Sequence, residues 1–219
     1  MKFSNLTIDE ILHRAKLAIS NALSDAEILA ALIIFGYDEV KLNQGLSICT
    51  EAESLVLMQT KEYGEQYQAQ DDFRESRSVA DKAYIKSLKI ARIAFNDNTE
   101  ALKSLNLLGS RKRTFSGWLT QAKTFYVNML ANDEYIASMQ KFGYTAEKLQ
   151  AEQALVMTAE TNNFSYDKEK GEAQQSTVNR DEKVDELIDW FRDFIEIARI
   201  ALEENPQWLE KLGIVVKSE

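Results

Sequence analysis

The chain has 219 residues, of which 45% are apolar and 28% are charged, and its formal net charge is −9. This balance is typical of a globular protein with a buried core, and the length suits one large domain or two small ones. The acidic excess is spread evenly, with a net charge of −4 over residues 1–108 and −5 over residues 109–219. Phosphate backbones and anionic lipid surfaces attract basic patches, so we expect neither nucleic acid nor a membrane as a partner.

The composition favours long helices. One proline and eight glycines leave few places for tight turns. Cys49 is the only cysteine, so neither an intramolecular disulfide nor a thiolate metal cluster can form within one chain. The first 25 residues carry charges throughout, unlike a signal peptide, and the longest apolar run, residues 28–35, is far shorter than the roughly 20 residues that cross a bilayer. We therefore expect an all-α protein in the cytoplasm.

The first predicted element is a helix over residues 7–35. Thr7 and Glu10 have the spacing of a capping box at its start. Apolar residues such as Leu12 and Ile19 then recur every three or four positions, as on the buried face of a helix. The polar spot around Asp25 is where this helix would break or kink, which would divide it into two.

Three further helices are predicted in the first half of the chain. Gly36 is suited to end one helix, and Asp38 to start the next, which we place at residues 38–68. A turn near residue 70 would lead into a third long helix over residues 73–96, and Asn98 would start a short one over residues 99–106. Long helices with short connections fold back into an up-and-down antiparallel bundle.

The whole pattern recurs after 107 residues without a gap. This shift takes residues 35–37 (FGY) to 142–144 and residues 90–94 (IARIA) to 197–201. Thr114 and Thr145 then repeat the helix starts, Asn132 repeats the possible break, and Asn205 precedes Pro206 at the start of the last short helix. Repetition at a fixed spacing over the full length indicates an internal tandem duplication.

The duplication predicts two tandem bundles, at residues 1–108 and 109–219. Each would contain three long helices, or four if the first is broken. We expect the bundles to pack against each other, because the linker around residues 109–113 is short.

Two resemblances accompany this pattern. The arrangement resembles spectrin-type three-helix repeats in architecture and approximate repeat length. The series FGY, KL, EYGEQ and LKIARIAF also resembles a group of bacterial all-helical, internally duplicated proteins of unknown function. That resemblance covers nearly the whole chain, and it implies no activity.

Among the polar residues that keep their identity in both copies, eight are candidates for contacts between helices: Asn21, Glu27, Glu53, Arg92, Asn128, Glu134, Glu160 and Arg199. With turns near residues 36 and 70, Asn21 faces Glu53 and Glu27 faces Arg92, and the second copy repeats both pairs. A buried arginine needs a partner that neutralises its charge. We expect a polar layer that fixes the helix register, and a binding pocket lined by the same groups is the alternative.

Residues typical of catalytic or metal sites are few. Glu10 and His13 form a Glu-x-x-His motif, but a di-iron bundle needs two such motifs and two further glutamates, and His13 is the only histidine. The same shortage argues against a Ser-His-Asp or Cys-His mechanism. Cys49 lies on an apolar helix face, where packing explains it, and the basic run at residues 111–113 is expected to be solvated linker. No cofactor is expected.

These observations favour a non-enzymatic helical scaffold or protein-interaction module that binds a protein partner or a second copy of itself. The alternative is a small-molecule or metal-binding protein, which could be an enzyme, with a carboxylate and arginine site between helices around Glu27, Glu53 and Arg92. The sequence contains no motif that separates the two hypotheses.

Overall fold

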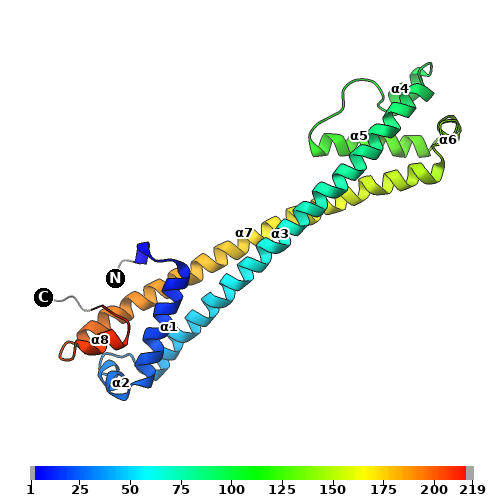
Figure 1. The fold of residues 1–219 in the computed structure, drawn as a ribbon. Helices are drawn as coiled ribbons and strands as arrows, with labels where there is room; N and C mark the ends of the chain where they lie inside the picture. The colour runs from blue at the N-terminus through cyan, green and yellow to red at the C-terminus, as the bar shows by residue number, and fades with distance from the viewer. Residues whose placement is uncertain (1–2, 216–219) are drawn as a thin grey trace. The chain divides into compact units, whose positions relative to one another are not determined.

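The computed structural model describes residues 3–215, and within them every regular element is helical, as predicted (Figure 1). A short 3-10 helix at Phe3–Asn5 precedes eight α-helices. These are α1 (Ile8–Ser24), α2 (Ala26–Ile33), α3 (Glu39–Ala94), α4 (Thr99–Ser104), α5 (Phe115–Leu130), α6 (Asp133–Gln140), α7 (Ala146–Ala201) and α8 (Gln207–Lys211).

The predicted start and break of the first helix are both confirmed. Thr7 and Glu10 form the capping box of α1, in which each side chain accepts a hydrogen bond from the backbone N–H of the other residue. Asp25 then ends α1 and starts α2, because its carboxylate accepts hydrogen bonds from the backbone N–H groups of Glu27 and Ile28. In the second copy Ala131 is the C-cap of α5, and the side chain of Asn132 starts α6 by accepting hydrogen bonds from two backbone N–H groups.

The boundaries of the long helices also agree with the predicted caps. Gly36 and Gly143 adopt φ values of +80° and +77°, in the left-handed region that glycine occupies without strain. The side chain of Asp38 caps the start of α3, and that of Asn98 caps the start of α4. Asn205 does not repeat this role with its side chain, because Pro206 is the residue at the N-cap of α8 and no side chain bonds there.

The helix bounds recur with the same spacing as the sequence. α2 begins at Ala26 and α6 at Asp133, while α3 spans Glu39–Ala94 and α7 spans Ala146–Ala201. Each pair of bounds differs by 107 residues, which is the shift that aligns the two copies. Both copies therefore form the same succession of helices.

The predicted turn near residue 70 is wrong. α3 runs without interruption for 56 residues, and so does α7, so the two helices expected in the middle of each copy are one. Residues 64–72 (GEQYQAQDD) contain no proline, and Gln, Glu and Ala are good helix formers. A single glycine costs about 1 kcal/mol in a helix interior, which is too little to break a helix of this length.

The described chain forms two compact units. Unit 1 comprises the residues up to Tyr63 and those from Glu172 onward. Its core is built from α1, α2, the first part of α3, the last part of α7 and α8, which gather together in Figure 1. Gln59 of α3 donates a hydrogen bond to Thr177 of α7 over 3.0 Å, and the two helices run antiparallel.

Unit 2 comprises Gly64–Gly171. The last part of α3 and the first part of α7 pack there with α4, α5 and α6 (Figure 1). Gln70 donates to the hydroxyl of Tyr166 over 3.1 Å, and these two residues are the sequence counterparts of Thr177 and Gln59. The contact between the two long helices is thus made by equivalent residues in each unit.

These units do not coincide with the expected bundles at residues 1–108 and 109–219. Because α3 does not fold back near residue 70, its second part packs against α5 rather than against α1. Each unit therefore combines the first part of one copy with the last part of the other. We call this arrangement crosswise assembly.

Candidate functional site

The retained asparagines bind the ends of the short helices. The amide of Asn21 donates a hydrogen bond to the carbonyl oxygen of Lys211 over 2.6 Å, and that of Asn128 donates to the carbonyl of Ser104 over 2.7 Å. Lys211 and Ser104 are the last residues of α8 and α4, where carbonyl groups lack partners within the helix. Asn21 and Asn128 thus hold the ends of α8 and α4 in place, instead of making the predicted contacts with Glu53 and Glu160.

The retained arginines hold the segments that follow the short helices. The guanidinium of Arg92 donates to the carbonyl of Leu107 over 3.0 Å, and that of Arg199 reaches the carbonyl of Val215 at 3.5 Å. Arg92 is exposed and Arg199 half-buried, so neither needs the carboxylate that we predicted for a buried charge. Each guanidinium instead donates to a backbone carbonyl, and an exposed or half-buried arginine keeps access to water for its other donors.

The predicted pairing of Glu27 with Arg92, and of Glu134 with Arg199, depended on the turn near residue 70 and is wrong. In each pair the two residues belong to different units. Glu27 and Glu134 are both exposed in the first turn of a short helix, α2 and α6. A negative charge there interacts favourably with the helix dipole, which explains why both copies retain it.

Glu53 and Glu160 form ion pairs that the sequence analysis missed. The ammonium group of Lys16 on α1 lies 2.8 Å from Glu53 on α3, and that of Lys123 on α5 lies 2.8 Å from Glu160 on α7. Each lysine contacts both carboxylate oxygens of its partner. The signal was present in the sequence, because Lys16 recurs as Lys123 at the same distance along the chain from its glutamate.

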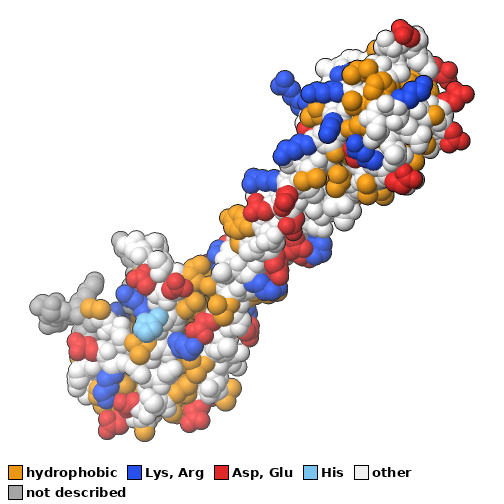
Figure 2. All heavy atoms as spheres, turned by 45° about the vertical axis from the view of Figure 1, so that its right-hand side comes forward, with side chains coloured by type: hydrophobic (Ala, Val, Ile, Leu, Met, Phe, Trp, Pro, Cys, Tyr) orange, Lys and Arg blue, Asp and Glu red, His pale blue; other side chains and the backbone are white. Residues whose placement is uncertain are grey.

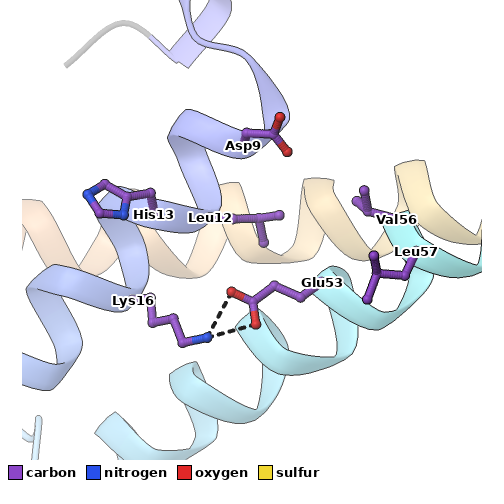
Figure 3. A pocket seen from close by; sticks show the side chains of 7 residues that line it. All are labelled: Asp9, Leu12, His13, Lys16, Glu53, Val56 and Leu57. Atoms are coloured by element: carbon purple, nitrogen blue, oxygen red, sulfur yellow. Dashed lines mark hydrogen bonds and ion pairs between the residues drawn. The ribbon is translucent and has the colours of Figure 1, made fainter. Parts of the chain in front are cut away.

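The Lys16–Glu53 pair lies at one side of a groove between α1 and α3 of unit 1, shown in Figure 3. The groove has a volume of about 490 Å³. Leu12, Val56 and Leu57 form its apolar lining, while Asp9 and His13 stand at its rim. In Figure 3 the imidazole of His13 points away from the Glu53 carboxylate, so these two groups do not converge on a common ligand position.

Unit 2 repeats the principal residues of this groove. Leu12 corresponds to Leu119, and the ion pair corresponds to Lys123–Glu160. Leu57, which is 73% exposed, corresponds to Phe164, which is 65% exposed. A large apolar side chain thus stands exposed at the same place beside the same ion pair in both units. We call the groove of unit 1 and the equivalent surface of unit 2, around Leu119, Lys123, Glu160 and Phe164, the lysine–glutamate grooves.

A buried polar cluster distinguishes unit 2 from unit 1. The carboxylate of Glu152 accepts hydrogen bonds from the hydroxyls of Ser87 and Tyr126, and both donors are fully buried. The hydroxyl of Tyr144 is also buried, and it makes no hydrogen bond to another described residue. Burial and the neighbouring Glu152 carboxylate raise the pKa of Tyr126 far above its usual value.

Glu10 and Cys49, which were considered as candidates for a catalytic or metal site, have structural roles. Glu10 is held in the capping box, and its hydrogen bonds with Thr7 lower its pKa. Cys49 is buried in the core of unit 1, and burial raises the pKa of its thiol to about 11. A thiol with this pKa is almost entirely protonated at neutral pH and is a poor nucleophile.

Among the described residues, none of the helices combines the length and apolar character needed to span a bilayer. Comparisons with family models, with curated proteins and with solved structures gave no match.

Proposed function

We propose that the protein is a non-enzymatic helical interaction module that binds a protein partner through its lysine–glutamate grooves. The observation that carries the proposal is that both units keep a large exposed apolar side chain, Leu57 or Phe164, beside the same ion pair. A large apolar side chain held exposed next to the same ion pair in both units is what a shared binding surface would present.

The chemistry of the groove in unit 1 also supports protein binding. Protein interfaces combine an apolar centre with a polar rim, and here Leu12, Val56 and Leu57 are bordered by the charged side chains of Asp9 and Lys16. An apolar side chain of a partner could pack against the leucines while its polar groups meet the rim. A cytoplasmic location stays a prediction.

The test is partner capture with variants of the full chain. Replacing Leu57 and Phe164 together by serine should reduce the recovery of partners at least tenfold, because both grooves lose their exposed apolar side chain. The matched control replaces Val40 and Val178 by serine. Both are exposed, and the other copy carries a charged residue at each position, Glu147 and Asp71. Equal recovery with all three proteins, or an equal loss in the control, would overturn the proposal.

The alternative of a carboxylate and arginine site between helices loses its geometric basis. It required Glu27, Glu53 and Arg92 to converge, but Glu53 pairs with Lys16 and Arg92 lies in the other unit. We do not propose a small-molecule site there.

The architecture itself has an evolutionary interpretation. We infer that duplication of a 107-residue segment produced both copies and that each copy now completes the bundle of the other. The matching bounds of α3 and α7 and the equivalent bonds of Asn21 and Asn128 support this inference.

A further inference from the structure

Unit 2 contains a hollow of about 510 Å³ that is surrounded mainly by cations. Arg77 of α3 lines one side, and Arg111, Lys112 and Arg113 of the segment between α4 and α5 line another. Asp81 is the single carboxylate among the lining residues. Four positive side chains against one negative side chain leave an excess of three positive charges around this hollow, which we call the basic hollow.

The cationic segment is fixed in place by three contacts. Arg111 pairs with Asp81 at 3.2 Å, and the backbone N–H of Lys112 donates to the side chain of Gln121 over 2.8 Å. The guanidinium of Arg77 donates to the carbonyl of Arg113 over 3.2 Å. Asp81 also accepts a hydrogen bond from the indole N–H of Trp118 over 2.9 Å. The like charges are therefore held near one another rather than free to separate.

Close packing at Gly117 also holds the cationic segment in place. A Cβ atom at this position would lie 2.8 Å from Cβ of Lys112, closer than side chains tolerate. The equivalent residue of the first copy is Glu10, which completes a capping box. α5 has no acidic residue in its first turn, so no carboxylate of this helix offsets the positive end of its dipole next to the hollow. The stem of Lys112 occupies the space that a side chain at position 117 would need.

The positions of unit 1 that correspond to these charged residues are uncharged. The counterparts of Arg77, Asp81 and Trp118 are Val184, Ile188 and Ile11, and the counterparts of the three consecutive cations are Ser4, Asn5 and Leu6. The same positions of the fold thus carry uncharged residues in one unit and surround a basic hollow in the other. Packing of the common fold does not require these cations.

The charge of the whole of unit 2 also favours the approach of an anion. Residues 64–171 contain 15 Lys and Arg against 14 Asp and Glu, whereas the rest of the chain contains 11 against 21. Unit 2 therefore has a net charge of +1 and unit 1 a net charge of −10, although the two sequence copies are almost equally acidic. Lys and Arg side chains are visible on the part that carries α4, α5 and α6 in Figure 2. An anion approaching the basic hollow meets no general repulsion from this unit.

We propose that the basic hollow binds an oligophosphate group, either as inorganic pyrophosphate or as the diphosphate end of a nucleotide. Guanidinium groups match phosphate oxygens in geometry and charge, and lysine adds a mobile point charge. A diphosphate carries about three negative charges at neutral pH, which balances the excess around the hollow. The volume lies within the range of about 300–1,000 Å³ that is typical of small-molecule pockets. No ion pair is formed by the side chains of Lys112 and Arg113 among residues 3–215, so both are available to such a ligand.

The test is isothermal titration calorimetry of the full chain with pyrophosphate, ADP, AMP and citrate at low ionic strength. We expect pyrophosphate or ADP to bind with one site per chain, at least tenfold more tightly than AMP or citrate. Tighter binding of ADP than of pyrophosphate identifies a nucleotide, and the reverse identifies the inorganic ion. Absence of binding by both, or binding of citrate as tight as that of pyrophosphate, would overturn the proposal.

Two charge-matched variants complete the test. Replacing Lys112 and Arg113 together by alanine should weaken pyrophosphate binding at least tenfold, and both residues are exposed, so folding should persist. The control replaces Lys86 and Lys89 together by alanine. Both are exposed cations of the same unit, and neither lines the hollow. Equal weakening in the two variants would mean that net charge alone attracts the anion, and would contradict a specific site.

Discussion

At the scale of single residues, Gly45 shows how closely the two copies fit together. A Cβ atom there would lie 2.4 Å from the nearest ring atom of Trp190, which belongs to the other copy. The counterpart of Gly45 is Glu152, and the counterpart of Trp190 is Ala83. A large ring over a glycine in unit 1 is thus replaced by a small residue and a glutamate in unit 2. The larger residue at one position is matched by a smaller residue at the other. This match is meaningful only if the first copy packs against the second.

We predict that Gly45→Ala destabilises the protein by about 1–3 kcal/mol, because the added methyl group overpacks the contact with Trp190. Alanine gains up to about 1 kcal/mol over glycine in a helix interior, and this gain will be exceeded. Urea unfolding measures the difference. Gly64→Ala is the matched control, since no atom lies within 4 Å of a Cβ at that helical position. It should stabilise slightly, and an equal response of the two variants would refute the close contact.

The Glu152 cluster could not have been inferred from the sequence. Glu152 occurs in a polar stretch (LQAEQA) and has glycine as its counterpart, so no repeated identity marks it. Its partners Ser87 and Tyr126 come from α3 and α5, and these helices meet only in the crosswise assembly. By contrast, the caps at Thr7, Asp38 and Asn98 were predictable because each depends on residues within four positions along the chain.

At the scale of elements, the length of α3 and α7 was the main error of the sequence analysis. The segment around residue 70 is polar and lacks the period of a buried helix face, which is also how a turn looks. In the structure this stretch stays helical with much of its side-chain surface exposed, and its polar residues bond across to α7 of the same unit, as Gln70 does with Tyr166. Hydrophobic periodicity gives no signal around residue 70, and the helix propensity of the residues there explains why α3 continues.

A proline at position 69 tests the continuity of α3 directly. Ala69→Pro should destabilise the protein by about 3 kcal/mol or more, because proline removes a backbone hydrogen bond and clashes with the preceding turn. Ala69→Gly, which keeps the N–H group, should cost about 1 kcal/mol. Thermal and urea unfolding compare the two variants. A turn at residue 70 would tolerate the proline, so equal stability of both variants would contradict a continuous helix.

At the scale of the whole molecule, crosswise assembly explains features that two separate bundles would not. The counts of charged residues give two similarly acidic sequence copies, yet the structural units differ by 11 charges. The repetition of the helices could be predicted from the sequence, because it concerns only the order of residues along the chain. The partner of each helix half could not, because nothing in the repeated identities says whether a copy packs on itself or on its duplicate.

The central claim of crosswise assembly is tested most directly by urea unfolding of two fragments, residues 64–171 and residues 1–108, followed by far-UV circular dichroism. The first fragment contains all of unit 2, including its core residues Phe125, Met139 and Leu149. The second is one complete sequence copy but lacks Phe191 and Phe194, which fill the core of unit 1. We predict that residues 64–171 unfold cooperatively as a monomer and that monomeric residues 1–108 do not. Cooperative unfolding of monomeric 1–108, with no folded 64–171, would contradict the account.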